Sequence, residues 1–555
     1  MQAAPPVRRH WRRPDGWSVA ALAAAMAVAA PLLAVLWLAL FPADDIWSHL
    51  ATTVLPGYVR TTLALMAGVA AATLVGGVGT AWLVTMCRFP GRRVFEWALL
   101  LPLAVPAYVV AYVYTDVLEY GGPVQGLLRE LFGWSSRRDY WFPQIRSLPG
   151  AVAMLSLVLY PYVYLLARAA FVEQSVCVLE VSRTLGRGPW GSFYQVALPL
   201  ARPAIVVGVS LVMMEALNDF GTVQHFAVAT LTAGVYDVWM QMNSTAGAAQ
   251  LSLVMLSFVL LLLGLERFAR RGRRFHHTTG KWRRLPRYRL AGLRGWLAFA
   301  VCALPTVLGF VLPMVVLVKY TLAAPSAFGG RFAEYLVNSL TLSATAAILA
   351  LAVGLTLAYA ARLNRSRLVA LAGRFSATGY ALPGAVLAVG VVIPFAALDN
   401  ALDHLMRQTF GISTGLLLSG TLVALTFGFV VRFLALALGS CEAGLAKVTP
   451  NMDGAARSLG LGPGRMLLRV HLPVLRASLL TAVMLVFVDG MKELPMTVLL
   501  RPFNFDTLAT HVYQYAAHEQ FEQAAAGALA IVVFGMLPVI VLSRTLSGAR
   551  PGHDA

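Results

Sequence analysis

The sequence predicts an all-α membrane protein with twelve transmembrane helices, arranged as two parallel six-helix repeats. Of its 555 residues, 59% are hydrophobic and only 12% are charged, which is more apolar surface than a soluble domain can bury. Apolar runs of about 20 residues, the length that a membrane-spanning helix needs, recur along the whole chain. A short polar segment between two such runs occurs twice, which indicates that one half of the protein is a duplicate of the other.

The apolar runs predict the helices in order. They lie at roughly 17–40, 59–86, 94–116, 148–170, 200–221, 249–267, 294–320, 336–361, 368–397, 412–440, 474–500 and 526–546. Basic residues precede helix 1 and follow helices 2, 6 and 8, and eleven Lys and Arg lie between Arg267 and Arg294 with no acidic residue. Because such residues are retained on the cytoplasmic side, both termini are predicted to be cytoplasmic. The loop around 117–147 falls outside, although it also holds several Arg.

The duplication sets the expected domain boundaries. The segment Glu180-Val-Ser-Arg-Thr-Leu-Gly-Arg-Gly-Pro189 matches Gly454-Ala-Ala-Arg-Ser-Leu-Gly-Leu-Gly-Pro463 at a constant shift of 274 residues (460 − 186 for the first glycine of each copy). Pro106 and Pro383 match at a shift of 277 (383 − 106). Because the two halves share one orientation, the repeat is parallel. The expected units are a first repeat (1–267, with an exposed loop at about 171–199), a basic cytoplasmic linker (268–293) and a second repeat (294–555, with an exposed loop at about 441–473).

Each repeated loop has a predictable shape. A short helix can run through Glu180–Leu185 and stop at Gly186, since glycine tolerates the left-handed conformation that ends a helix. Pro189 suits the first turn of a second short helix, and Pro199 suits the start of the next membrane helix. The expected product is a helix-turn-helix knob that fits a groove of a partner.

This pattern resembles the coupling loop of ABC importer permeases of the binding-protein-dependent type, in which the loop docks onto the ATP-hydrolysing subunit. The first copy keeps the acid and the glycine of the family pattern, Glu180 and Gly186, but has Val181-Ser182 for Ala-Ala. The second has Gly454 where the acid is expected, so either Asp453 replaces it or that contact is lost. The resemblance implies coupling residues in both copies: Glu180, Arg183, Gly186 and Pro199, and Asp453, Ala455, Ala456, Arg457, Gly460 and Pro473.

A second repeated set of polar residues lies in the helix after each loop. Glu215, Asn218 and Asp219 share a register with Asp489, Lys492 and Glu493, again 274 residues apart (489 − 215 and 493 − 219). Spacings of three and four place each set on one helical face. Charged groups inside a membrane face a cavity or pair with each other. Two interpretations stay open: these residues line the translocation path near its outer mouth, or Lys492 neutralises Asp489 or Glu493 in a packing network.

The resemblance also implies a function. The segments 216–223, 492–498 and 500–509 are most similar to the fused two-half ferric-iron branch of that family, an architecture that thiamine permeases share. The expected protein is the membrane-spanning permease subunit of an ATP-driven importer for ferric iron. Thiamine, another small solute, or an ion-coupled secondary transporter are the alternatives. The expected partners are two copies of an ABC ATPase subunit and an extracytoplasmic solute-binding protein, and the expected location is the inner (plasma) membrane with multiple passes.

Chemistry of its own is not expected of this chain. The pattern Gly-x4-Gly-Lys-Ser/Thr of a phosphate-binding loop does not occur, so ATP hydrolysis is expected on a separate subunit. The four cysteines have no paired metal spacing, and no catalytic residue, metal site or cofactor is predicted. The net charge of +19 is interpreted as cytoplasmic retention of basic residues, with no nucleic acid as partner.

Overall fold

The computed structural model describes residues 16–42, 46–172, 174, 182, 184–186, 188–270, 287–324, 328–364 and 366–547. In this part of the chain, eleven helices are long and apolar enough to cross a membrane. The number is twelve if the pair Arg92–Ala104 and Ala107–Phe132, bent by 89°, is one span. The all-helical membrane fold predicted from the sequence is therefore confirmed.

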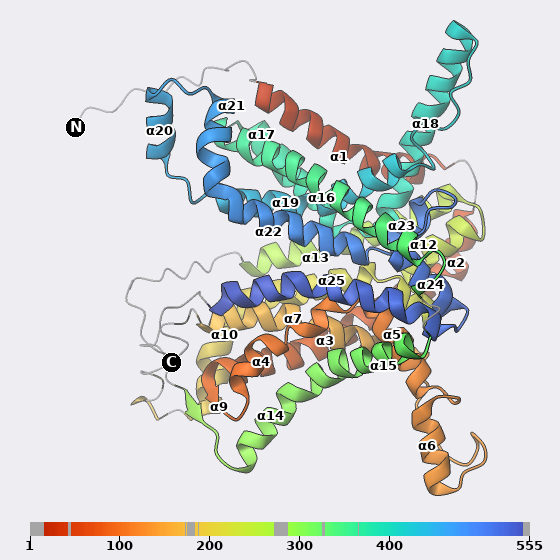
Figure 1. Ribbon diagram of the computed structural model, residues 1–555, viewed down its shortest axis with the longest axis vertical. Coiled ribbons are helices and arrows are strands. Elements are labelled where there is room, and N and C mark those ends of the chain that lie inside the picture. The colour runs from red at the N-terminus through yellow and green to blue at the C-terminus, as the bar shows by residue number, and fades with distance from the viewer. Residues whose placement is uncertain are drawn as a thin grey trace.

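The elements follow one another from the N-terminal side of the chain as labelled in Figure 1. The helices encoded by the first half are α1 (Gly16–Leu40), α2 (Trp47–Thr53), α3 (Leu55–Met86), α4 (Arg92–Ala98), α5 (Ala107–Leu118), α6 (Pro123–Phe132), α7 (Leu148–Val172), α9 (Pro189–Ser192), α10 (Leu198–Asn218), α11 (Gly221–His225), α12 (Leu231–Met240) and α13 (Thr245–Arg270). Strand β1 (Cys87–Arg88) pairs in parallel with β2 (Tyr288–Arg289) beside the linker.

The helices encoded by the second half follow. They are α14 (Leu293–Thr306), α15 (Leu312–Ala323), α16 (Phe332–Leu363), α17 (Arg367–Ser376), α18 (Gly384–Phe410), α19 (Leu422–Leu445), α20 (Pro450–Ser458), α21 (Pro463–Met466), α22 (Leu472–Lys492), α23 (Pro495–Leu500), α24 (Leu508–Ala517) and α25 (Phe521–Ser547).

Two predicted helices are broken, and the sequence interpretation was wrong to draw them as continuous. The spans expected at 94–116 and 368–397 each pass through a 3-10 turn, at Leu101–Ala104 and Ala377–Ala381. The next residue in each turns to extended backbone, with ψ of 124° at Val105 and 103° at Leu382. The cause is the following proline, which disfavours helical backbone in the residue before it. The chain then restarts as α5 and α18.

The helices after the repeated loops begin earlier than expected. Their spans run over Trp190–Asn218 and Pro463–Lys492, so Pro199 and Pro473 lie inside them rather than at their starts. Each proline follows a π-helical turn, Phe193–Ala197 or Leu467–His471. Such a turn lets a helix continue past a residue that has no N–H to donate. The other expected boundaries at 412 and 500 also move, since α19 begins at Leu422 and α22 ends at Lys492.

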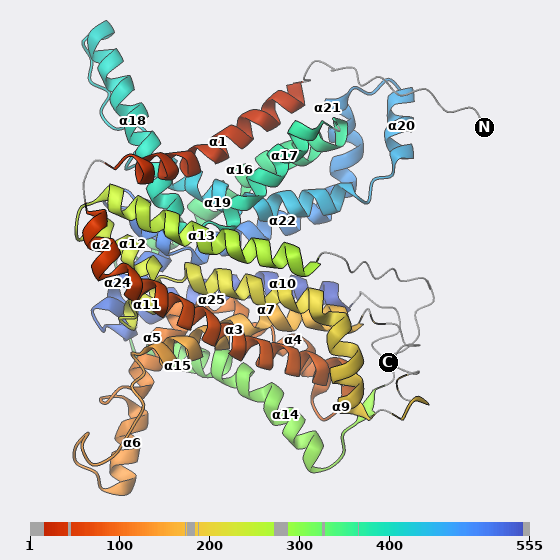
Figure 2. The ribbon, with the colours of Figure 1, turned by 180° about the vertical axis from the view of Figure 1, so that it is seen from behind.

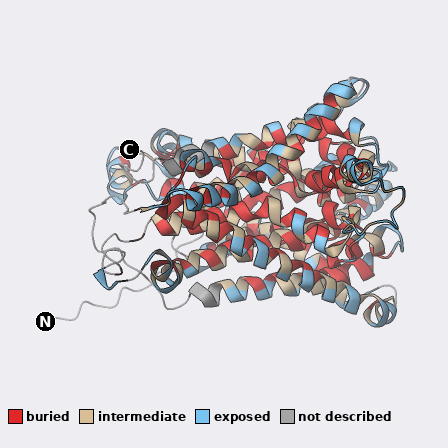
Figure 3. Ribbon diagram, turned by 90° about the horizontal axis from the view of Figure 1, so that it is seen from below, coloured by how far each residue is buried: buried red, intermediate tan, exposed pale blue. Residues whose placement is uncertain are grey.

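The two halves exchange their first long helices. Helix α1 packs against α16, α17 and α18 of the second half, whereas α14 and α15 pack against α3, α4 and α5 of the first. The same exchange is visible from both sides in Figures 1 and 2. Buried residues run along the interior of the bundle, and exposed residues gather at its two ends (Figure 3). Helices α9 and α20 mark one end of the bundle, and α6 and the distal part of α18 project from the other (Figure 1).

Candidate functional site

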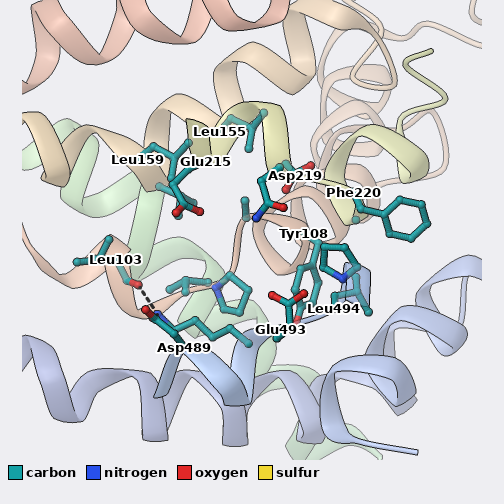
Figure 4. A pocket seen from close by; sticks show the side chains of 18 of the residues that line it. Leu103, Tyr108, Leu155, Leu159, Glu215, Asp219, Phe220, Asp489, Glu493 and Leu494 are labelled. Atoms are coloured by element: carbon teal, nitrogen blue, oxygen red, sulfur yellow. Dashed lines mark hydrogen bonds and ion pairs between the residues drawn. The ribbon is translucent and has the colours of Figure 1, made fainter. Parts of the chain in front are cut away.

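A pocket of about 140 Å³ lies where α10 and α22 end. Its walls contain all six polar residues that the sequence predicted for the path: Glu215, Asn218, Asp219, Asp489, Lys492 and Glu493. Glu215 and Asp219 face Asp489 and Glu493 from opposite sides (Figure 4). The two halves therefore bring their repeated polar sets together at one place. The path itself stays a prediction.

Asp219 and Glu493 end their helices instead of sharing a helical face with the other polar residues, as the spacing had suggested. Both are the first residue after the helix, with extended ψ of 127° and 114°. Asp219 accepts hydrogen bonds from the backbone N–H groups of Thr222 (3.0 Å) and Val223 (3.1 Å). Glu493 likewise accepts one from Met496 N (3.0 Å). Each carboxylate thus holds the unpaired N–H groups that begin α11 or α23.

Contacts across the pocket join the two halves. The Tyr380 hydroxyl donates to Glu215 Oε1 over 3.2 Å. The Asn218 side-chain oxygen accepts from Gly384 N at 2.8 Å and from Arg432 Nη1 at 3.2 Å. Lys492 Nζ donates to the Leu103 carbonyl at 3.2 Å. Most of these contacts therefore use residues next to the helix breaks at Pro106 and Pro383.

Arg432, on α19, is a pocket residue that the sequence interpretation missed. Its guanidinium Nε lies 3.4 Å from Glu493 Oε2, and both side chains are nearly inaccessible, at 7% and 5% exposed. Lys492 Nζ lies 3.7 Å from Asp489, so the expected pairing of Lys492 involves Asp489. An arginine inside the apolar run 412–440 was the signal, because such a residue needs a partner or a cavity.

The charges of the pocket are unevenly divided. Each half contributes two carboxylates, but both cationic side chains, Arg432 and Lys492, come from the second half. The residue 274 positions before Arg432 is Val158, which also lines the pocket (432 − 274 = 158). Within the described residues, no group of three or more His, Cys, Asp and Glu is placed to hold a metal ion.

The repeated loops have the same backbone at their turns. Gly186 and Gly460 both have φ of +76°, the left-handed conformation that favours glycine. The leucines before them are strongly exposed, Leu185 at 71% and Leu459 at 80%. The sequence interpretation passed over these leucines, although both copies have Leu at this position. Helices α9 and α21 then begin at Pro189 and Pro463, as expected.

The remaining coupling residues fall in different surroundings. Glu180 and Arg183 lie outside the described residues. Ala455, Arg457 and Pro473 are exposed, and Ala456 is buried. Pro199 lies within the first turn of α10. The coupling role of all of them stays a prediction.

The Asp453 carboxylate forms ion pairs with two other residues of this chain. It pairs with Arg362 Nη2 and with His471 Nε2, each over 2.9 Å, and its side chain is 14% exposed. Arg362 also donates to the carbonyls of Leu445 and Val448, both at 2.8 Å. These contacts tie α20 to the ends of α16 and α19 and to the π-helical turn before α22, so Asp453 has a structural task that the sequence did not suggest.

The fold and the pocket together define a class. Eleven or twelve spanning helices surround a small polar pocket in which both halves meet, the architecture of a multi-pass membrane permease. Residues 74–274 match the family described as "Binding-protein-dependent transport system inner membrane component".

Curated relatives extend the match over most of the chain. The Fe(3+)-transport system permease protein FbpB 2 of Haemophilus influenzae is 26% identical over 88% of this chain and 89% of its own length. The molybdenum transport system permease protein ModB of Escherichia coli is 28% identical over 34% of this chain and 81% of its own. A probable sulfate transport system permease protein, cysT of Chlorokybus atmophyticus, is 30% identical over 40% of this chain and 75% of its own. The chain therefore belongs to the binding-protein-dependent permeases of ABC importers and is a fused, two-half member of that family located in the inner membrane.

Proposed function

We propose that this chain is the permease subunit of an ATP-driven importer whose cargo is ferric iron. A solute-binding protein delivers the iron at the end of the bundle that bears α6, and two copies of an ATPase dock at the other end. In this orientation both termini are cytoplasmic, as the distribution of basic residues indicates. The observation that carries the proposal is the pocket, in which four carboxylates face two cationic side chains.

The charge of the pocket favours a cation. Four acidic against two basic groups leave an excess of negative charge that attracts a cation and repels an oxyanion. The molybdenum and sulfate relatives are similar to less than half of this chain, whereas the ferric relative is similar along 88% of it. The charge supports iron over these oxyanions, and the coverage supports the fused two-half architecture that the ferric relative shares. Thiamine carries a positive charge as well, so it is the alternative cargo that an experiment must separate.

The two loops with Gly186 and Gly460 are the proposed ATPase contacts. Each presents an exposed leucine, Leu185 or Leu459, on a fixed left-handed turn. An exposed apolar side chain on a rigid turn suits insertion into a groove. Closure and opening of the ATPases then shift the permease between two states of access, because they bind those states unequally.

A second candidate function is ion-coupled secondary transport. Broken helices at membrane depth are typical of such carriers, and the chain breaks at Pro106 and Pro383 beside the pocket. Coupling to a proton or sodium gradient would then run through Glu215, Asp219, Asp489 and Glu493. The distinguishing measurement is uptake in cells whose proton and sodium gradients are both collapsed while ATP is maintained. Continued uptake supports the importer, and its loss supports the carrier.

Uptake of labelled ferric iron tests the cargo. The strain carries this permease with its ATPase and binding protein as its sole iron importer, and excess molybdate, sulfate or thiamine is added in turn. ATP-dependent iron uptake that none of the three solutes reduces is the expected result. Competition by thiamine, or uptake of labelled thiamine in place of iron, contradicts the assignment of iron but leaves the importer class intact.

A further inference from the structure

Two helical arms leave the bundle at the end remote from the repeated loops. One is α6 with the segment that follows it to Trp141, and the other is the distal part of α18, from Leu398, with the segment that returns to α19. They point away from each other and run across the direction of the spanning helices (Figures 1 and 2). They occupy matching places in the two halves, since α5 and α18 both restart after the repeated prolines.

The first arm is internally braced along one side. Gln125 donates to the Leu118 carbonyl (2.7 Å) and accepts from the Tyr140 hydroxyl (2.6 Å). Asp139 accepts from the backbone N–H groups of Ser136 (2.7 Å) and Ser135 (2.8 Å). These N–H groups hold the pKa of Asp139 below its usual range. The return segment is thereby fixed against one face of α6.

The second arm is braced by different residues. Asp399 is buried and accepts from the backbone N–H of Leu417 (3.1 Å), Leu418 (3.0 Å) and Ser419 (2.7 Å). One turn further along α18, Asp403 accepts from Thr414 N (2.8 Å) and Gly415 N (3.2 Å). The return segment therefore lies along the aspartate side of α18.

Both arms leave an apolar ridge on the opposite side. In α6 the ridge contains Leu127 (57% exposed) and Leu131 (68%), four residues apart. In α18 it contains Leu398 (56%), Leu402 (38%) and Leu405 (58%), spaced by four and three. These spacings place each ridge on one helical face, away from the bracing carboxylates and amide. Each arm also has an exposed aromatic side chain, Trp141 (85%) on the first and Phe410 (65%) on the second.

We propose that both arms lie along the membrane surface, with their leucine ridges in the lipid headgroup layer. An amphipathic helix that runs in the membrane plane buries its apolar face at this boundary. Exposed Trp and Phe side chains suit the same depth.

A protein partner fits these arms less well than lipid does. The arms leave the bundle in opposite directions (Figure 1), so a protein seated on the end of the bundle between them would contact their bases rather than their full lengths. Lipid, in contrast, lies beneath both. The arms then anchor the outer end of each half separately at the membrane surface.

The test places one cysteine at a time in the full-length protein, with the four native cysteines replaced by serine. Each variant is reconstituted in phosphatidylcholine nanodiscs and labelled with bimane. Leu131→Cys and Leu405→Cys report the ridges. Arg138→Cys and His404→Cys are matched controls, because these exposed residues lie off the ridges on the same arms. Doxyl groups near the lipid headgroup should quench the ridge labels at least about twofold more than the controls. The cysteine variants keep every bracing hydrogen bond of the return segments, so the fold is retained.

Every other pattern overturns the proposal in part or whole. Equal quenching at ridge and control positions excludes a lipid-facing ridge. If the ridge label is quenched on one arm alone, the ridge of the other arm does not lie in the headgroup layer. Weak lipid quenching of the ridge labels, with protection from soluble iodide when the solute-binding protein is added, assigns the ridges to that protein instead.

Discussion

The two repeated loops share one turn, and the contacts at their bases differ among the residues that the structure describes. In the first half, the base of the loop is an aromatic cluster, with the Trp82 ring 5.6 Å from Phe171 and 4.9 Å from Phe193. In the second half, the corresponding support is the cluster of Arg362, Asp453 and His471. The left-handed glycine has the same φ of +76° in both. The same turn geometry is therefore compatible with different packing beneath it.

The pocket shows the same divergence at its walls. The carboxylates are repeated in both halves, but Arg432 has a valine, Val158, as its counterpart. The second half thus provides all of the pocket's positive charge as well as the charged loop base. Three changes break or sharpen this comparison.

The largest effect is expected from the feature that the halves share. Gly186→Val or Gly460→Val forces a β-branched side chain into the left-handed conformation, which costs about 1–2 kcal/mol or more and misdirects the exposed leucine. Transport should fall to background while ATP hydrolysis continues and the protein still inserts. Among the residues that the structure describes, no atom beyond the chain neighbours lies within 4 Å of a Cβ added at either glycine, so the strain comes from the backbone conformation.

Gly462→Val is the matched control for this pair. Gly462 has an ordinary φ of −70° and open space around it, so this variant should transport normally. Normal transport by both Gly186→Val and Gly460→Val would show that the turns do not couple the permease to the ATPase.

A smaller effect on transport, although a larger one on stability, is expected from making the pocket walls alike. Arg432→Val leaves Glu493 nearly buried without its cationic partner, a loss on the order of 3–5 kcal/mol in folded proteins. The amount of inserted protein and its melting temperature in detergent should both fall. Adding Glu493→Gln removes the unpaired charge and keeps an acceptor for Met496 N, so it should restore both quantities. If the double variant is no better than the single one, Arg432 stabilises the pocket through packing rather than charge.

The smallest effect is expected from the acids of the two loops. Asp453→Ala removes the partner of Arg362 and His471, which should loosen α20 by about 1–3 kcal/mol. Hydrogen exchange over residues 450–458 should accelerate, with little change in ATPase affinity. Glu180→Ala should instead weaken ATPase attachment. Equal losses of ATPase affinity in both variants, with unchanged exchange, would make Asp453 a direct contact.

Much of the fold could be predicted because hydropathy and the repeat are local signals. The runs of apolar residues indicate the membrane class, and the shift of 274 residues aligns Glu215 with Asp489 from the sequence alone. The breaks at Pro106 and Pro383 were missed, although both prolines were matched as a pair. Proline has two outcomes inside an apolar run, a break or a kink, and the neighbouring helices that decide between them are distant in sequence.

Long-range contacts explain the rest of what was missed. The pairing of Arg432 with Asn218 joins residues 214 positions apart, and the Asp453–His471 pair depends on how α20 folds back. The exchange of α1 and α14 between the halves cannot be read from the hydrophobic pattern of the sequence, because each helix is apolar whichever half it contacts. In contrast, the glycine turns were predictable, since one residue type and one backbone conformation explain them.

The central claim is that the carboxylates of the pocket attract the cargo, and iron uptake tests it most directly. The variant with Glu215→Gln and Asp219→Asn removes the first half's negative charge, while the amide oxygen introduced by Asp219→Asn can still accept from Thr222 N. Uptake of labelled ferric iron is measured in proteoliposomes with the ATPase and binding protein, per amount of permease. Glu334→Gln, an exposed acid in the first turn of α16 outside the pocket and the repeated loops, is the control. The double variant should lose about tenfold or more, equivalent to about 1.4 kcal/mol, while the control keeps full uptake. Full uptake by the double variant would contradict the claim and leave these acids as structural residues.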